Sequence, residues 1–192
     1  IVTYYLVVAL VSAAASSHIV TQLRRDIQRG ELTALIIKPI NYIWFRTMQE
    51  LSYRVIELCI GAVAIALLFL LIPQYLTLPS MPSTYLLFTL AVIVSYTLSH
   101  LLQFLLGFVG FWLVETSALE QVLTIVGIFL SGQVAPLTFF PPFIAKTAAW
   151  LPFQYMFFFP TQIYLEKLTA LQIVAGFSIA ASWILALGAA VW

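Results

Sequence analysis

The sequence predicts an all-α protein that crosses a membrane several times. The chain of 192 residues is 63% hydrophobic and only 8% charged, and its mean hydropathy is +1.07. Soluble proteins, in contrast, are about one quarter charged. Roughly five apolar stretches of about 20 residues, each long enough to cross a bilayer, would account for nearly the whole length. We therefore expect a polytopic membrane protein without a soluble catalytic domain.

The few charges are concentrated in one stretch, residues 19–57. Six of the eight Lys and Arg residues lie there, together with four of the seven acidic residues. Short segments rich in Lys and Arg stay on the cytoplasmic side during insertion. We therefore expect residues 19–57 to be cytoplasmic, in an inner or plasma membrane, and we count the topology from them.

Residues 1–18 form the first expected span. The run carries no charge and ends at His18, which we interpret as an interfacial residue. With an odd number of crossings the two chain ends lie on opposite sides, so the C-terminus is expected inside and Ile1 outside. Because Ile1 already lies within an apolar run, we expect one further span before it.

Residues 19–41 form a cytoplasmic amphipathic segment. Apolar residues recur at every fourth position from Ile19 to Ile27, as on one face of a helix, and we expect this helix to lie along the membrane surface. Gly30 can end it in the left-handed conformation, and a second short helix stops before Pro39. The charge pattern leaves two interpretations open: a solvated loop anchored by an interfacial helix, or a docking element for a cytoplasmic partner.

A long helix is expected at residues 42–72, with Asn41 as its cap. Its ~31 residues would extend ~46 Å, beyond the ~30 Å of hydrocarbon, so the first turns must project from the membrane core. Four charged residues follow one another along those turns at spacings of three or four: Arg46, Glu50, Arg54 and Glu57. We expect them to pair along one face, each pair stabilising the helix by roughly a few tenths of a kcal/mol.

The second half of the chain contains the remaining spans and an irregular segment. Spans are expected at residues 84–108, 121–135 and 171–192. Between the last two, residues 136–167 are apolar and rich in aromatic side chains, but five prolines interrupt them. Prolines prevent one regular spanning helix. We therefore expect broken helices that dip into the outer leaflet and return, with their backbone groups satisfied inside the protein.

Several functions are excluded by residues that the chain lacks. No Asp, Glu, Lys or Arg lies at the centre of an expected span, and His100 lies near the end of one. Ion-coupled transporters need such intramembrane groups. The sequence has no H-E-x-x-H or Gly-rich phosphate loop, and no base is placed beside Ser131. We expect no catalytic residue, no metal or cofactor bound by this chain and, because basic and acidic residues are interleaved, no nucleic-acid partner.

Two parts of the sequence resemble the ABC-2 type permeases, most closely the bacterial daunorubicin or viologen exporter type. Residues 26–32 (DIQRGEL), followed by Lys38-Pro39, resemble the cytoplasmic D-I-x-x-G-E-L … P segment of that family. Residues 111–160, with FW, LSGQVAPLTFFP, LPF and a final proline, are similar to the later F-W … L-S-G … P-L … F-P … P-F … P pattern. The resemblance covers nearly the whole chain but not a first span, and Lys38 stands where an Arg is common.

The resemblance implies a type V exporter-like transmembrane domain of six helices. It also implies a second permease subunit, identical or homologous, and two cytoplasmic ABC ATPase subunits that hold ATP and Mg. Residues 24–39 would form the coupling helix seated on the ATPase, and residues 136–167 a re-entrant hairpin at the outer side. The implied ATPase interface comprises Arg24, Arg25, Asp26, Gln28, Arg29, Gly30, Glu31, Leu35, Lys38 and Pro39. The implied hairpin or gate residues are Ser131, Gly132, Pro136, Phe139, Phe140, Pro141, Phe153 and Pro160.

We predict a permease subunit of an ATP-driven exporter, in which closure of the ATPases moves residues 24–39 and the long helix transmits that shift. An uncharged, aromatic path suits a hydrophobic or amphipathic cargo, such as a drug in multidrug efflux, a lipid or a lipid-linked glycan. Phe139, Phe140 and Phe153 are gate candidates or, equally, lipid-facing or core aromatics. One alternative is a non-transporting scaffold that recruits a cytoplasmic protein, and another is a membrane enzyme that depends on His100.

Overall fold

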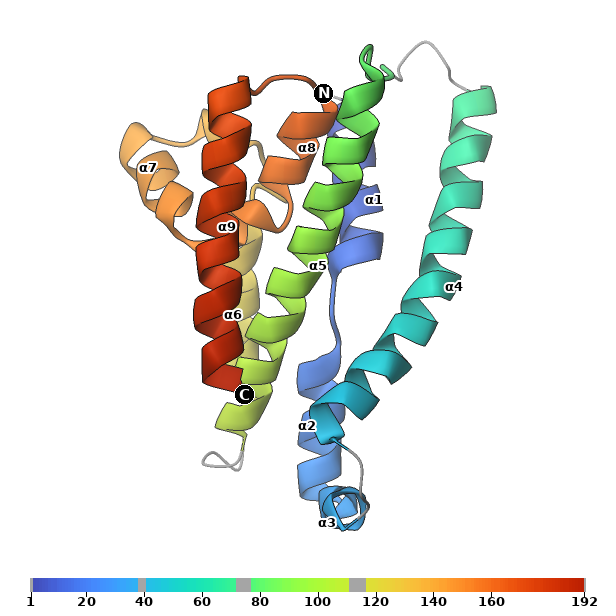
Figure 1. Cartoon of the computed structure of the whole chain (residues 1–192), viewed down its shortest axis with the longest axis vertical. Coiled ribbons are helices and arrows are strands. Elements are labelled where there is room, and N and C mark those ends of the chain that lie inside the picture. Colours follow the sequence, from blue (N-terminus) through green and yellow to red (C-terminus); the bar gives the residue numbers. More distant parts are fainter. Residues whose placement is uncertain (1, 38–40, 72–76, 111–116, 192) are drawn as a thin grey trace.

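The computed structural model describes residues 2–37, 41–71, 77–110 and 117–191, and these form helices and turns without a strand (Figure 1). Six helices follow the long axis of the molecule: α1 (Val2–Ala15), α2 (Ile19–Gln28), α4 (Tyr42–Leu71), α5 (Pro82–Val109), α6 (Ser117–Leu130) and α9 (Ala170–Val191). Shorter elements are α3 (Glu31–Ile36), η2 (Leu137–Phe139), α7 (Pro142–Trp150), η3 (Pro152–Tyr155) and α8 (Phe158–Tyr164). The predicted all-α class is confirmed.

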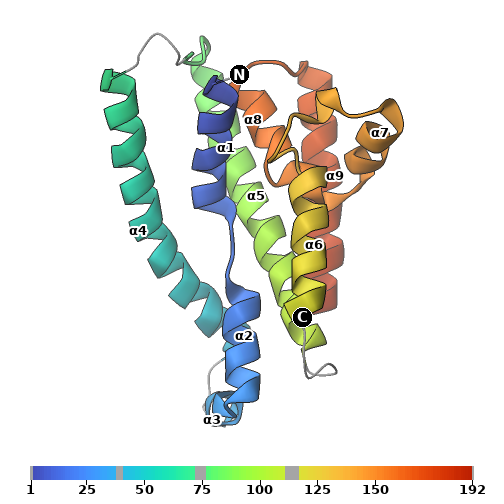
Figure 2. The same ribbon diagram turned by 180° about the vertical axis from the view of Figure 1, so that it is seen from behind.

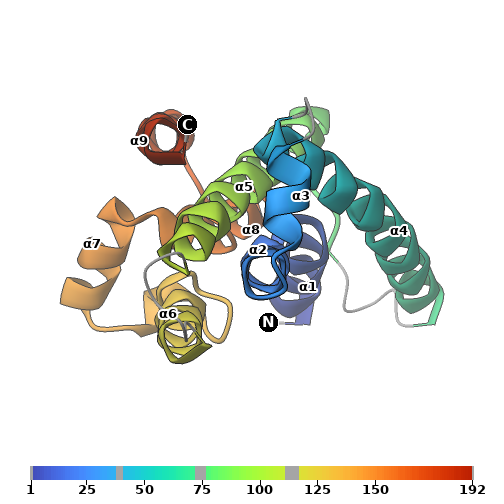
Figure 3. The same cartoon turned by 90° about the horizontal axis from the view of Figure 1, so that it is seen from below.

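Helix α5 is the element on which the others pack. It contacts α1, α2, α8 and α9, and Figure 3 shows it between α9 on one side and α1 and α2 on the other. Pro82 opens the helix, where the missing N–H has no helical partner to lose. Ala91, Leu98 and Phe104 are fully buried on its packed faces. The largest core cluster joins α5 to η3, α8 and α9.

Helices α1 and α2 follow one direction along the molecule (Figures 1 and 2). Helix α2 stands parallel to α1, and Figure 3 shows it end-on. Our expectation that residues 19–29 lie along the membrane surface stays a prediction. The apolar face of α2 packs on α5, and Ile19 and Leu23 on this face are 1% exposed. The short helix α3 is the piece that runs crosswise.

Three stretches of the described residues are long and apolar enough to cross a bilayer: Val2–Gln28, Pro82–Val109 and Ala170–Val191. A shorter apolar helix lies at Gln121–Leu130. The sequence predicted a span at residues 121–135, but α6 ends at Leu130. The chain turns at Gly132, where a φ of 75° favours glycine. The count of crossings for the whole chain stays a prediction.

The proline-rich segment 136–167 is built from broken helices, as the sequence indicates. Pro142 and Pro152 stand at the first positions of α7 and η3, where proline is tolerated. Figures 1 and 2 show the chain descending through α7 and rising again through α8, both in the half of the molecule that contains the start of α1. The segment thus has the form of a hairpin, and its depth in the membrane stays a prediction.

Helix α4 diverges from the rest of the molecule. It begins beside α2 and separates from α1 and α5 toward its C-terminal end (Figures 1 and 3). Among the described residues it packs mainly on α1, where a β-carbon at Gly61 would lie 3.9 Å from the Ala13 side chain. Large apolar side chains such as Val55, Ile60 and Val63 are at least 60% exposed along it.

Candidate coupling element and the polar clusters behind it

The coupling element, residues 24–39 of the sequence analysis, bends sharply at Gly30. Helix α2 ends as Arg29 and Gly30 donate their backbone N–H groups to Arg25 and Ile27 at 2.9 and 3.2 Å. Gly30 has a φ of 71°, and nothing lies within 4 Å of a β-carbon built on it. The conformation, rather than the space, therefore favours glycine here. The left-handed end expected from the sequence is confirmed.

The outer surface of this bend carries half of the ten residues expected at a partner interface. Arg25, Gln28, Arg29, Gly30 and Glu31 are all exposed. The side chains of Arg29 and Glu31 are 68% and 57% exposed and lie 3.9 Å apart, Nη1 to Oε1. An exposed pair of this kind contributes under about 1 kcal/mol to stability. Its charges are available to another protein.

The other predicted interface residues are placed differently. Arg24 and Leu35 are half-buried, and Lys38 and Pro39 lie outside the described residues. Asp26 was expected on the partner-facing surface, but the structure buries it at 3% exposure. It therefore faces the interior of the protein, where it binds residues of α4.

Asp26 joins α2 to the first turns of α4. Its Oδ1 accepts a hydrogen bond from Arg46 Nη2 at 2.6 Å, and its Oδ2 accepts one from Arg46 Nε at 2.9 Å. The Tyr42 hydroxyl donates to the same Oδ2 at 2.5 Å. Arg46 also bonds Gln49 Oε1 at 2.5 Å. Two-pronged pairing of guanidinium and carboxylate fixes both distance and orientation, so α2 and α4 are braced against each other.

A second polar cluster lies where the chain breaks between α1 and α2, at residues 16–18. The break leaves backbone groups without helical partners. Arg54 Nη1 donates to the Ala13 carbonyl at 3.3 Å, and Glu50 Oε1 accepts the His18 N–H at 2.8 Å. A cation thus meets the negative end of α1 and a carboxylate meets the positive end of α2. Both charged side chains are supplied by α4.

This cluster extends to α5 through His100, which is 6% exposed. Its Nε2 lies 2.9 Å from the Thr47 hydroxyl, and its Nδ1 lies 3.4 Å from the Ser17 hydroxyl and 3.8 Å from Glu50 Oε2. His100 was expected near a span end, as the residue on which the membrane-enzyme alternative depends. In the structure it connects α5 to the charged residues of α4.

The expected ladder of charges along α4 is correct only in part. Arg54 does pair with Glu50, at 3.4 Å from Nη2 to Oε1, and with Glu57. Arg46 pairs with Asp26 of α2, however, and not with Glu50. Arg54 and Glu50 are also 4% and 2% exposed, so they do not form a solvated face. The burial follows from their contacts with the open backbone at the α1–α2 break.

The sequence did not reveal these two links, although it contained a hint of one. Ser16, Ser17 and His18 interrupt an otherwise apolar run, and a polar interruption of this kind predicts open backbone groups. Charged side chains on a later helix could have been assigned to them. Asp26 and Arg46 are 20 positions apart on different helices, and no local spacing rule connects such residues.

The residues assigned to the outer hairpin do not converge on one gate. Ser131, Gly132 and Pro160 are buried, Pro141 is exposed, and Phe140 is half-buried. Two cavities separate the remaining gate candidates. Pro136 and Phe139 line a cavity of about 370 Å³ at the end of the molecule where α1 begins, whereas Phe153 lines another of about 320 Å³ between α5 and α6.

The sequence of the whole chain, residues 1–192, matches the family model described as an ABC-2 family transporter protein. The chain belongs to the ABC-2 transporter family. No curated protein and no solved structure matches it. This membership confirms the resemblance drawn from the two sequence motifs. The ABC-2 chain is a membrane permease, and permeases of this family generally work with ABC ATPase partners.

Proposed function

We propose that this permease is the membrane subunit of an ATP-driven exporter of hydrophobic or amphipathic molecules. In this proposal, separate cytoplasmic ABC ATPase subunits bind ATP and Mg and dock on the exposed bend around Gly30, between α2 and α3. The bend carries the proposal, because its outer surface presents exposed charged side chains while its inner side is braced to two further helices. A solvated loop would not require that bracing.

The first step of transmission runs from α2 to α5. Leu23 packs so closely on α5 that a β-carbon at Gly107 would lie 2.7 Å from its Cδ2 atom. Ile19 and Leu23 are both buried along this contact. Close-packed interfaces shift between discrete arrangements rather than deform smoothly. A push on the bend would therefore displace α5, on which most of the other helices rest.

The second step runs from α2 to α4 through Asp26 and Arg46. Because the carboxylate bonds two nitrogens of the guanidinium, α4 must follow a movement of α2. Beyond its first turns α4 diverges from the other helices (Figure 1). It could then change its tilt without disturbing the core around α5. The exposed apolar side chains of α4 would face lipid or the second permease subunit, and the cargo would pass between the two permeases.

The test is to purify the permease from native membranes with the ATPase that accompanies it. Arg25→Glu and Glu31→Lys reverse exposed charges on the bend, and each should reduce both ATPase recovery and ATP turnover. Lys146→Glu, which reverses an exposed charge on α7, is the matched control and should change neither. Normal recovery and turnover in all three variants would refute docking at the bend.

The same experiment separates the exporter from a membrane scaffold. A scaffold would also bring a cytoplasmic protein, and the charge reversals would also weaken its binding. That protein would have no ATPase activity, however. An exporter should in addition move an amphipathic dye across proteoliposome membranes only when ATP is present. If the captured partner hydrolyses no ATP, the result would refute the exporter hypothesis and support the scaffold hypothesis.

A further inference from the structure

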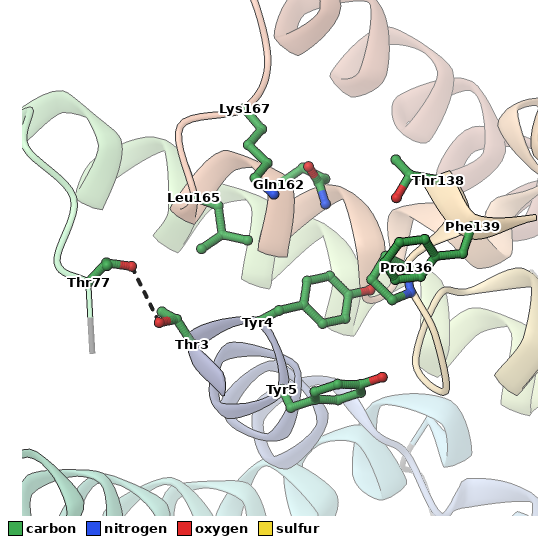
Figure 4. Close-up of a pocket in the computed structure, with 10 residues that line it drawn as sticks. All are labelled: Thr3, Tyr4, Tyr5, Thr77, Pro136, Thr138, Phe139, Gln162, Leu165 and Lys167. Carbon is green, nitrogen blue, oxygen red and sulfur yellow. Dashed lines mark hydrogen bonds between the residues drawn. The ribbon is translucent and has the colours of Figure 1, made fainter. Parts of the chain in front are cut away.

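The cavity at the hairpin end of the molecule has the composition of a binding site (Figure 4). Its volume is about 370 Å³, at the lower end of the range of small-ligand pockets. The start of α1, the loop around η2, and the end of α8 all contribute to its wall. Figure 4 shows hydroxyl, amide and ammonium groups on this wall together with aromatic rings. The wall therefore offers two kinds of surface to one ligand.

Gln162 supplies a side-chain amide that faces the cavity. The residue is 6% exposed, and among the described residues its side-chain amide makes no hydrogen bond. An amide that lines a cavity and has no protein partner is available to hydrogen-bond a ligand there. Figure 4 shows this amide extending into the cavity toward Thr138. A ligand in the cavity would supply the missing bond.

Lys167 places a positive charge on the same wall. Its backbone N–H donates to the Gln162 carbonyl at 3.1 Å, and its side chain lines the cavity. Within the described part of the chain its ammonium forms no ion pair. Lys146 is the other cation outside residues 19–57, and it lies on α7, away from this lining. A single unpaired ammonium beside a free amide favours a ligand with one anionic group.

The neighbouring carboxylate cannot neutralise Lys167, because it is engaged elsewhere. Glu166 accepts hydrogen bonds from the N–H groups of Ser80 and Met81, both at 3.1 Å, and from the hydroxyls of Ser80 and Thr84 at 2.6 and 2.9 Å. These bonds lower the pKa of Glu166 to about 2. The carboxylate therefore stays ionised and attached to the start of α5, and the charge of Lys167 is left for the cavity.

The rest of the lining carries no charge and combines aromatic and apolar side chains with the hydroxyls of three threonines. Tyr4 and Tyr5 use their hydroxyls to bind the carbonyls of Gly132 and Val134, at 2.5 and 2.9 Å. Both rings line the cavity, and Phe139 stands at its rim with 74% of its surface exposed. Gln162 also borders a cavity of about 290 Å³ next to α9, but no charged residue contributes to that lining. The cavity with Lys167 is the one suited to an anion.

We propose that this cavity binds the head of an amphipathic anion, with Lys167 and Gln162 as the headgroup ligands and Tyr4 and Phe139 along the apolar part. The ligand class is a single-chain amphiphile with a phosphate or carboxylate head. A tail longer than the cavity would leave past Phe139 at the rim. The site concerns binding alone and stands whether or not the molecule is the exported cargo.

The test measures binding to the purified full chain in a neutral detergent. The probes are lysophosphatidic acid, palmitate and lysophosphatidylcholine with the same acyl chain. The first two should bind about 10-fold more tightly than the third, since a charge-assisted hydrogen bond is worth roughly one factor of ten or more in affinity. Comparing phosphate with carboxylate identifies the preferred head.

Two variants and a matched control make the assignment specific. Lys167→Gln should weaken binding of the anionic probes about 10-fold, and Gln162→Leu should weaken it less, because a neutral hydrogen bond contributes less than a charged one. Lys146→Gln loses the same charge on α7 and should bind as the wild type does. Thermal unfolding of each variant checks the fold, and Gln162→Asn replaces Gln162→Leu if that variant fails to fold.

The proposal has clear contrary outcomes. Equal affinity for the zwitterionic and the anionic probes would show that the cavity does not select charge. Equal weakening by Lys146→Gln and Lys167→Gln would show that the anions bind nonspecifically. Binding of a neutral glycoside in preference to all three probes would assign the cavity to a different ligand. The assay contains no ATPase, so its failure leaves the proposed docking at Gly30 untouched.

Discussion

The two ends of the permease are held together by different forces. At the end with the bend, buried ion pairs such as Asp26 with Arg46 connect helices that are distant in the sequence. At the hairpin end, tyrosine hydroxyls and one exposed carboxylate bond to backbone groups, and aromatic rings fill the spaces. Ion pairs fix orientation, whereas apolar contacts allow neighbouring packings. The end with the bend is therefore suited to transmitting a movement of the bend, and the hairpin end is suited to changing its packing in response.

The largest expected effect comes from removing the brace between α2 and α4. Asp26→Ala leaves the largely buried Arg46 side chain without its carboxylate partner, and we expect the unfolding free energy to fall by about 3 kcal/mol. Replacing both residues, as in Asp26→Ala with Arg46→Met, should recover much of that loss because no unpaired charge remains. The measurement is SDS titration in mixed micelles, with the exposed Glu31→Ala as control. A loss for Asp26→Ala no larger than that of the control would contradict the brace.

A smaller effect is expected in the apolar core of the other end. A β-carbon at Gly176 would lie 2.6 Å from Phe159 Cζ, and a buried ring cannot turn aside freely. Gly176→Ala should therefore lower the unfolding free energy by about 1 to 3 kcal/mol. Adding Phe159→Leu should restore part of it. If the stability loss of the double variant equals the sum of the losses of the two single variants, the contact between Gly176 and Phe159 is not tight.

Gly107→Ala tests the contact between α2 and α5 with a smaller expected loss of stability. The added methyl meets Leu23 Cδ2 at 2.7 Å, but this is the end of a flexible side chain that can change rotamer. We expect a stability loss of about 1 kcal/mol or less, together with weaker ATP turnover in the assembled complex. Ala91→Gly, on the same helix but away from α2, is the comparison for stability. Unchanged turnover would remove α5 from the transmission route.

The smallest effect concerns Glu166 and depends on pH. Its pKa is lowered to about 2 in the folded protein, below the ordinary value of about 4.3. A lowered pKa means that its contribution to stability is complete above about pH 4.3 and is lost as the pH falls toward 2. Wild type should therefore unfold at a higher temperature than Glu166→Gln at pH 6, and the difference should narrow below pH 4. A difference that widens with acid would contradict this assignment.

Local features of the permease could be predicted from its sequence, and contacts between distant residues could not. Gly30 and Asn41 were identified correctly because turn and cap chemistry depends on adjacent residues; Asn41 Oδ1 accepts the N–H of Trp44 at 3.1 Å. The prolines of residues 136–167 predicted broken helices for the same reason. The contact between α2 and α5 was not predicted, since an apolar stripe on a helix fits a lipid surface and a neighbouring helix equally well.

In the candidate sites, too, contacts between residues distant in the sequence could not be predicted. Charge concentration located the bend, but Asp26 was placed on the wrong side of it because its partner Arg46 comes from another helix. Gln162 and Lys167 lie in a segment where prolines and aromatic residues dominate the pattern. Their common wall depends on how the chain folds back after α8, which spacing does not describe. The gate candidates were grouped by sequence proximity, and the structure separates Phe139 from Phe153.

The break between α1 and α2 also has a consequence for biosynthesis. Its backbone groups at Ala13 and His18 are satisfied by Arg54 and Glu50, which the ribosome makes some tens of residues later. Until then these backbone groups at the two helix ends have no side-chain partner from α4. Insertion of α4 would therefore be the event that locks the first two helices, and premature termination before Glu50 should yield a product that quality-control proteases degrade.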